Sequence, residues 1–461
     1  MSGNKLSNTL ALPTSVSVRD EHRQDPLSVF ASLREKFPGE CFLLESVEGP
    51  EKTARYSFIG VDPISTFRSK GTMIVIDENA YRVPSAYDSL RGHFKSFDCG
   101  ASDLAPFSGG MVGFIGYGMV SEFEGIQLPD GEDEIPDMYF VLPRHLVCID
   151  HLDEKTYLIS HGDLRELKEA FNTVREKEET GIVIRGGTPN TSQEEFESKV
   201  VEAKEMIMEG EIFQVVPSRS IDFEIHGDPL EMYRVLRSLN PSPYLFYLDF
   251  GETKLIGSSP EMLVRLKGTK LTTRPLAGTR PRDPDPEEDE KLKLDMLLDV
   301  KERAEHLMLV DLHRNDMGRV SRTGTVKVTE LMNVEKFSHV QHIVSNIESE
   351  LDDSFDAFDA LKACFPAGTV TGAPKIRAME IISDLEDERR GPYAGAAGYF
   401  DFNGNMDFGI VIRSIVLHGK RARLQAGAGI VHDSIPEKEY METQHKMGAL
   451  LLALMTKDME D

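Results

Sequence analysis

Two pairs of glutamates, each with its members three residues apart, lie in segments of strong helical character. The first pair is Glu302 and Glu305, in "KERAEHLMLVDLHRND", and Leu298 and Leu309 extend the same stripe at spacings of four residues. Residues at these spacings share one face of a helix. Carboxylates on an otherwise apolar face are costly to bury and repel one another unless a cation meets them. The pattern therefore raises the possibility of a metal site.

The second pair is Glu439 and Glu442, in "IPEKEYMETQHKMGALLLAL". Its stripe consists of Ile435, Glu439, Glu442, Lys446, Ala449 and Ala453. Hard oxygen ligands on two helices suit Mg²⁺, which keeps waters and often bridges to an anionic substrate. Either pair taken alone is better explained by acids that face solvent, but two such pairs, each in line with apolar residues, favour the metal site. Glu442 and His445 also have the spacing of a di-iron bundle ligand pair, but that fold requires two such motifs on helices alone.

A histidine pair, His339 and His342, lies in "FSHVQHIVSNI" among β-branched residues. A zinc site is not indicated, because there is no cysteine or third histidine at useful spacing. A single histidine acting as acid or base and a purely structural histidine both fit this stretch.

The elements that carry these residues indicate an α/β (α+β) fold. Strand-like runs such as "KLIGSSPEMLVRL" (254–266) follow one another directly, with helices expected over 287–312, 354–364 and 436–457. Strands in direct succession favour antiparallel sheets with packed helices. A loop-like stretch before Thr191 and Ser192 precedes a new helix start. We therefore predict two subdomains, residues 1–190 and residues 191–461.

The composition excludes several classes of protein. The net charge of −26 over 461 residues disfavours nucleic acid and anionic membranes as partners. No apolar run approaches the length of a membrane span, and the N-terminus lacks the pattern of a signal peptide. The four cysteines are widely separated, as in proteins with reduced thiols. We expect a cytoplasmic protein.

Taken together, the motifs resemble those of the chorismate-utilising enzymes over nearly the whole chain. The anchors include "IFQVVPSR" (212–219), "NPSPYLF" (240–246), "GSSPE" (257–261), "RPLAGTRPR" (274–282), "AGTVTGAPKIRAME" (367–380), "QAGAGIV" (425–431) and "EKEYMETQHK" (437–446). The resemblance implies antiparallel sheets packed as a sandwich with flanking helices. It is greatest to the members that convert chorismate and ammonia to anthranilate and pyruvate, the first step of tryptophan biosynthesis.

The resemblance also assigns roles to individual residues. It implies that Mg²⁺ is bound directly by Glu305 and Glu442, with Glu302 and Glu439 holding its waters. It implies catalytic roles for Glu261 as the acid, for His342 in pyruvate elimination, and for Thr369. The chorismate-binding positions that it implies are Gly278, Thr279, Tyr393, Arg413, Gly427, Ala428, Gly429 and Lys446.

Two positions separate this chain from similar family members. Relatives that add water carry a lysine where this chain has Gln214, which cannot act as a base. Many aminodeoxychorismate synthases carry a nucleophilic lysine where this chain has Ala277. The resemblance therefore favours an anthranilate product, and the aminodeoxychorismate synthase component is the alternative.

The resemblance further implies a regulator and a partner. A tryptophan feedback site is implied at Glu45, Ser46, Pro243, Tyr244 and Leu245, although both stretches could simply be packing between subdomains. No GxCxG or GxSxG nucleophile motif occurs, so the resemblance implies that a separate glutamine amidotransferase subunit supplies ammonia.

Overall fold

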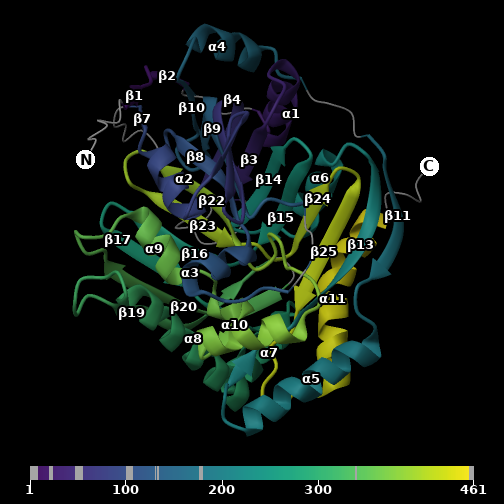
Figure 1. The fold of residues 1–461 in the computed structure, drawn as a ribbon. Helices are drawn as coiled ribbons and strands as arrows, with labels where there is room; N and C mark the ends of the chain where they lie inside the picture. The colour runs from purple at the N-terminus through teal and green to yellow at the C-terminus, as the bar shows by residue number, and fades with distance from the viewer. Residues whose placement is uncertain are drawn as a thin grey trace.

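The computed structural model of the protein is shown in Figure 1. It describes residues 9–19, 24–46, 55–99, 107–129, 131, 134–175, 180–337 and 340–455, without the side chains of residues 449 and 452–455. His339 and the side chains of Ala449 and Ala453, which figured in the sequence patterns, lie outside this description.

A long antiparallel pair, β4 (Tyr56–Lys70) and β9 (Met138–Asp150), joins two sheets. From β4, the first sheet runs through β3 (Cys41–Glu45), β14 (Tyr244–Phe250), β15 (Thr253–Ser259), β24 (Ser414–His418), β25 (Arg421–Gly427), β13 (Ser218–Gly227) and β11 (Ile182–Pro189). Shorter strands flank the central pair, namely β5 (Met73–Ile76) and β6 (Asn79–Arg82) beside β4, and β10 (Lys155–Ser160) and β2 (Ser15–Arg19) beside β9.

The second sheet starts from β9. It runs through β8 (Gly110–Ile115), β22 (Ala396–Asp401), β23 (Met406–Ile410), β16 (Met262–Lys267), β17 (Lys270–Arg274) and β20 (Val340–Glu350). β18 (Leu276–Pro281) lies beyond β17 along the same edge of β20, and β19 (Lys327–Lys336) pairs with the opposite edge. All of these pairings are antiparallel, which confirms the predicted sheet type.

The two sheets pack face to face over a core rich in aromatic residues. This core joins Phe42 and Phe246 from the first sheet to Phe114 and Tyr399 from the second, all of them buried. Alternating strand residues supply such a core because successive side chains point to opposite faces of a sheet. The predicted sandwich is therefore confirmed.

Helices cover the outer faces of both sheets (Figure 1). Those over the first sheet are α1 (Pro26–Lys36), α4 (Leu164–Asn172), α6 (Leu230–Leu239) and α11 (Pro436–Met455). Those over the second are α2 (Ala86–Phe94), α3 (Val120–Glu124), α8 (Val300–Gly318), α9 (Ala357–Cys364) and α10 (Lys375–Leu385). α5 (Gln193–Met208) packs against α11 and begins at a capping box formed by Ser192 and Glu195, as the sequence predicted.

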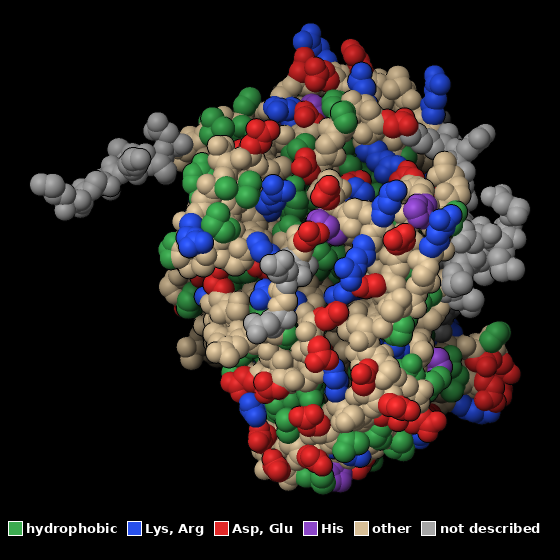
Figure 2. All heavy atoms as spheres, turned by 45° about the vertical axis from the view of Figure 1, so that its right-hand side comes forward, with side chains coloured by type: hydrophobic (Ala, Val, Ile, Leu, Met, Phe, Trp, Pro, Cys, Tyr) green, Lys and Arg blue, Asp and Glu red, His purple; other side chains and the backbone are tan. Residues whose placement is uncertain are grey.

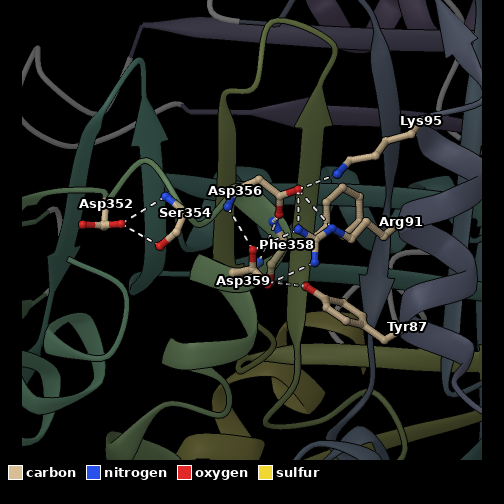
Figure 3. Close-up of polar contacts among 8 residues, drawn as sticks. All are labelled: Tyr87, Arg91, Lys95, Asp352, Ser354, Asp356, Phe358 and Asp359. Carbon is tan, nitrogen blue, oxygen red and sulfur yellow. Dashed lines mark hydrogen bonds and ion pairs between the residues drawn. The ribbon is translucent and has the colours of Figure 1, made fainter. Parts of the chain in front are cut away.

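Strands from both sides of residue 190 pair within the same sheets, β3 with β14 and β8 with β22. Polar contacts add to this association (Figure 3). On α2, the Arg91 guanidinium donates to both carboxylate oxygens of Asp359 at 3.1 and 3.0 Å and to Asp356 at 3.0 Å. Asp356 is the N-cap of α9, so the ion pairs bind α2 at the start of that helix. The division into residues 1–190 and 191–461 stays a prediction about sequence organisation.

The predicted bounds of one helix are wrong. The helix predicted over 287–312 is two helices, α7 (Pro286–Leu298) and α8, separated at Asp299. The Asp299 carboxylate accepts hydrogen bonds from the backbone N–H groups of Lys301 and Glu302, which starts a new helix there. Leu298 consequently lies outside the stripe and its side chain is 70% exposed, whereas Leu309 is buried. Ile435, at the start of the second stripe, is also exposed.

The surface in Figure 2 carries interspersed acidic and basic side chains, with acidic ones numerous over its lower part. In the part of the chain that the structure describes, no helix has the length and apolar character needed to cross a bilayer. All four cysteines are buried free thiols, as the sequence predicted.

Candidate active site

The chain passes from one sheet to the other at two adjacent places, and each carries a charged residue. Glu261 lies in the link between β15 and β16, and Arg413 lies between β23 and β24. The backbone N–H of Ser258 donates to the Arg413 carbonyl at 3.2 Å, and that of Ile410 donates to the Glu261 carbonyl at 3.0 Å. Arg413 takes a positive φ of 51° at this crossing, which is uncommon for a residue with a side chain. The two crossings therefore place an acid and a cation side by side.

A cavity of about 230 Å³ opens at these crossings. The predicted site residues that line it are Glu261, Gly278, Thr279, Glu305, His342, Thr369, Tyr393, Arg413, Gly427, Gly429, Glu442 and Lys446. Gln214 and Ala277, the two positions that separate the chain from similar family members, line it too. The structure thus brings together residues from ten separate stretches of the sequence.

Glu261 is 4% exposed, and one of its carboxyl oxygens, Oε1, has no hydrogen-bond partner among the described residues. Burial raises the pKa of Glu261 to about 8, an effect that the neighbouring Thr369 hydroxyl and the Leu276 backbone partly oppose. The carboxyl is therefore largely protonated near neutral pH, because burial disfavours its charged form. A buried, protonated carboxyl that faces a cavity can donate a proton to a leaving group.

His342, on β20, is 1% exposed. Its Nδ1 lies 2.9 Å from the Gly278 carbonyl oxygen, and the Thr279 hydroxyl is 3.1 Å from the same nitrogen. Because a carbonyl can only accept, we assign the proton to Nδ1, which leaves the lone pair on Nε2. Nε2 has no partner in the described part of the chain. Burial, with a contribution from Arg413, lowers the pKa of His342 to about 4, so the ring is a neutral base at physiological pH.

Three groups in the cavity can hold carboxylates. No carboxylate among the described residues forms an ion pair with Arg413, and burial lowers the pKa of its guanidinium, an effect that Glu261 opposes. The Tyr393 side chain is buried and lies close to Gly427. A Cβ atom added to Gly427 would lie 3.1 Å from the Tyr393 hydroxyl oxygen. Lys446 donates to the Gly427 carbonyl at 2.9 Å. A buried cation that has no ion-pair partner among the described residues indicates an anionic ligand.

One glutamate of each pair lines this cavity, Glu305 from α8 and Glu442 from α11. Burial raises the pKa of Glu305, and repulsion from Glu302 and Glu442 adds to the effect. Burial also raises the pKa of Glu439, again with repulsion from Glu442. Carboxylates that affect one another's pKa must lie close together. The four carboxylates therefore lie near one another, with Glu305 and Glu442 in the lining of the cavity and Glu302 and Glu439 outside it.

The carboxylate oxygens of this acidic group are ligands of the kind that bind a divalent cation. The amide of Gln214 donates to Glu305 at 2.8 Å, Arg280 to Glu302 at 3.1 Å, and Lys446 lies 2.8 Å from Glu442. Within the described residues, no three His, Cys, Asp or Glu side chains are arranged to hold a metal ion. Carboxylates spread over two helices suit Mg²⁺ with retained waters better than a closed protein cage.

A second cavity of about 300 Å³ lies between the two sheets. All the residues predicted for tryptophan line it: Glu45, Ser46, Pro243, Tyr244 and Leu245. The Glu45 carboxylate already has protein partners, because it accepts hydrogen bonds from the Tyr233 hydroxyl at 2.6 Å and from the Arg237 guanidinium at 3.1 Å. Its carboxylate is therefore bound by protein groups rather than free.

Some features of the site lie beyond the sequence interpretation. Ala428 is fully buried and is not among the cavity-lining residues. Conversely, Gln425 lines the cavity and Arg280 holds Glu302, and neither was singled out. The position of Gln425 immediately before the glycine-rich "AGAG" was the available signal.

Comparison with known proteins gives the class to which this fold and site belong. The model of the chorismate binding enzyme family matches residues 39–452. The chain therefore belongs to the chorismate-binding enzymes.

Similar members of that family are anthranilate synthase components. The chain is 47% identical to anthranilate synthase component 1 of Methanothermobacter marburgensis, over 94% of this chain and 93% of the relative. It is 44% identical to that of Aquifex aeolicus, over 97% and 95%. The crystal structure of anthranilate synthase component I from Streptococcus pneumoniae TIGR4 aligns with a TM-score of 0.77 and 38% identity, covering 87% of this chain and 95% of that chain.

The menaquinone-specific isochorismate synthase of Escherichia coli shares the fold. It is 24% identical, with a TM-score of 0.71, over 96% of this chain and 95% of that chain.

Proposed function

We propose that the protein is a chorismate-aminating lyase, the synthase component of an anthranilate synthase, which converts chorismate and ammonia to anthranilate and pyruvate. The observation that carries this proposal is the presence, in one cavity, of the buried Glu261 carboxyl and of His342 Nε2, which has no partner among the described residues. Two groups whose environments push their pKa values apart divide naturally into an acid and a base.

In the first step, the nitrogen of ammonia forms a bond to C2 of chorismate and loses a proton to solvent. The ring double bonds move from C1–C2 and C5–C6 to C1–C6 and C4–C5, and the C4–O bond breaks. The electron pair leaves with the C4 oxygen, which takes a proton from Glu261 and departs as water. Gln214 favours ammonia over water as the nucleophile, because an amide cannot remove a proton from water. Its Nε2 is also occupied by Glu305.

In the second step, His342 removes the proton from C2 through Nε2, and the C3–O bond to the enolpyruvyl group breaks. The ring becomes aromatic and pyruvate leaves. Arg413 and Tyr393 bind the enolpyruvyl carboxylate, and Arg413 supplies the planar pair of donors that suits it. The Gly278 carbonyl fixes the tautomer of His342, so the base needs no reorganisation.

Mg²⁺ is part of the proposal. Glu305 and Glu442 would bind it directly, and Glu302 and Glu439 would hold its waters. When bound, the ion would neutralise the ring carboxylate of chorismate and relieve the repulsion among these four side chains.

A product assay tests the proposed function. Purified protein with chorismate, Mg²⁺ and ammonium chloride at alkaline pH should form fluorescent anthranilate and an equal amount of pyruvate. Omitting ammonium is the control and should abolish the fluorescence. Accumulation of a non-aromatic amino product would instead establish the aminodeoxychorismate alternative.

We also propose tryptophan as a feedback inhibitor that binds in the second cavity. The apolar side chains of Pro243 and Leu245 would pack against the indole, and Ser46 would bind the polar end. Tyr233 and Arg237 already hydrogen-bond to the Glu45 carboxylate. We therefore expect Glu45 to shape the cavity and contribute charge rather than to bind the tryptophan ammonium group by itself.

Replacing Ser46 with phenylalanine should relieve this inhibition, because the added ring occupies the cavity. We expect at least about a tenfold rise in the tryptophan concentration for half-inhibition, with kcat within about twofold. Ser46→Ala, which adds no volume, is the matched control. Equal inhibition of wild type and Ser46→Phe would place the regulatory site elsewhere.

A glutamine amidotransferase subunit is the proposed ammonia source, and the cytoplasm the proposed location. Support for the first comes from the absence of a nucleophile-elbow motif in the sequence. Free thiols at all four cysteines fit a reducing compartment.

A further inference from the structure

A buried ion pair lies behind the wall of the substrate cavity. Glu386 is the C-cap of α10, and Arg390 follows four residues later, before β22. Their side chains are 6% and 1% exposed, and neither lines the cavity. The Arg390 guanidinium donates to both carboxylate oxygens of Glu386, at 2.6 and 2.9 Å. Burying two charges costs free energy that their attraction often only just repays, so such a pair raises the possibility of a positioning role.

The same guanidinium reaches two stretches of the cavity wall. Its Nη2 donates to the Val216 carbonyl at 2.6 Å, in the link that follows β12 (Gln214–Val215). Its Nη1 donates to the Val370 carbonyl at 2.9 Å, at the end of the short 3-10 helix η2 (Gly368–Val370). Val216 and Val370 both line the cavity. One guanidinium therefore fixes two segments of the wall relative to each other.

Arg390 also lies beside Tyr393, a third part of the wall. The guanidinium carbon is 5.7 Å from the centroid of the Tyr393 ring, within the range of a cation–π contact. The backbone N–H of Tyr393 donates to the Arg390 carbonyl at 3.2 Å. Burial raises the pKa of Tyr393 to about 12, an effect that the Arg390 charge opposes. The phenol therefore keeps its proton and can donate a hydrogen bond to a carboxylate.

Glu386 extends the arrangement to a fourth part of the wall. Its Oε1 accepts from the Ser218 backbone N–H at 2.7 Å and from the Ser218 hydroxyl at 2.8 Å. The Ser218 oxygen in turn accepts from Gln425 Nε2 at 2.8 Å. Gln425 lines the cavity from β25. The carboxylate of Glu386 thus holds the side chain of Gln425 through a single hydroxyl.

We propose that the Arg390–Glu386 pair positions the walls of the chorismate site and so fixes the place from which Tyr393 donates to the enolpyruvyl carboxylate. This inference rests on the proposed function and adds two positioning residues to it, neither of which touches the substrate. The four wall segments come from distant parts of the chain, so no single helix or strand can hold them together. A wall that is already ordered lowers the cost of binding.

The proposed metal-binding side of the cavity is separate from this arrangement. Glu305 and Glu442 lie on α8 and α11. Within the described part of the chain, the hydrogen bonds and ion pairs of Arg390 and Glu386 involve neither of these helices. Loosening the pair should therefore weaken chorismate binding and leave the Mg²⁺ requirement unchanged.

Arg390→Lys tests the proposal, because lysine keeps the charge beside Glu386 but lacks the planar fork that reaches both backbone carbonyls. The Kd for chorismate, measured by calorimetry with Mg²⁺ and without ammonium, should rise about tenfold or more. The lost contacts act alike on bound substrate and transition state, so kcat at saturating chorismate should stay within about threefold. The Mg²⁺ concentration for half-maximal activity, also at saturating chorismate, should not change.

Arg91→Lys is the matched control, since Arg91 makes the same kind of fork with Asp359 (Figure 3) and neither residue lines the cavity. It should leave the Kd for chorismate within about twofold of wild type. Ser218→Ala is a milder second variant, which removes the hydroxyl between Glu386 and Gln425. It should raise the Kd by about threefold, and it decides the question if Arg390→Lys does not fold.

Three results would overturn the positioning role. They are an unchanged Kd in folded Arg390→Lys (or in Ser218→Ala, if the first variant does not fold), an equal rise in Arg91→Lys, and a joint change of Kd, kcat and Mg²⁺ requirement, which indicates general loosening. If wild type binds chorismate but forms no anthranilate, the proposed function fails, and the comparison of Kd values still decides the role of the ion pair.

Discussion

Replacing Glu442 with glutamine should lower kcat by about 10²–10³-fold, while the protein keeps its fold. The side chain lies at the cavity wall, where the proposed metal would dock the ring carboxylate, and the amide loses the charge that the cation requires. Half of the side chain is exposed, so its replacement disturbs little packing. The measurement is kcat together with the Mg²⁺ concentration for half-maximal activity, which should rise.

Glu437→Gln is the matched control, since Glu437 is an exposed acid in the first turn of the same helix. It should leave kcat and the Mg²⁺ requirement unchanged. Undiminished kcat in Glu442→Gln would remove the metal assignment.

Replacing Glu261 with glutamine should have opposite effects on activity and stability. The variant has no acid for the C4 oxygen, so we expect kcat to fall by about 10²–10⁴-fold. In the wild type, kcat should decline as the pH rises through about 8, where the carboxyl loses its proton. The neutral form of His342, with a pKa of about 4, persists across this range.

The stability effect follows from linkage. The pKa of Glu261 is about 8 in the folded protein against an ordinary 4.5, so the folded state binds the proton more tightly. Wild-type stability therefore falls as the pH rises from about 4.5 to about 8, and the glutamine variant avoids this loss. At pH 8 the variant should be more stable by up to about 4 kcal/mol, with no difference near pH 4.5.

Urea unfolding at pH 4.5 and pH 8 measures this difference, with the exposed Glu252→Gln as control. A variant that is less stable than wild type at pH 8 would contradict the assignment of a buried protonated carboxyl.

The sequence predicted the sheet type and the cavity residues well, but for different reasons. Strands in direct succession indicate antiparallel pairing through local pattern alone. The assignment of Tyr393 and Arg413 to one cavity came from resemblance, because no local rule brings such distant segments together. The break at Asp299 was not predicted because residues 287–312 have high helix propensity throughout. An aspartate ends one helix and starts the next only when its side chain caps the backbone N–H groups that follow, and the sequence does not show whether it does.

The pairing of the Glu45 carboxylate could not be predicted either. Tyr233 and Arg237, which occupy it, lie nearly two hundred residues away on α6. A side chain's charge is evident from sequence, but its partner depends on tertiary packing.

The adjacent crossings at Glu261 and Arg413 have a mechanical consequence. Each is hydrogen-bonded to the strand of the other, so this point is common to both layers of the sandwich. A small rotation of one layer against the other displaces its distant edges most and this common point least. The distance between Glu261 and Arg413 should therefore change little during thermal motions that displace the rest of the molecule.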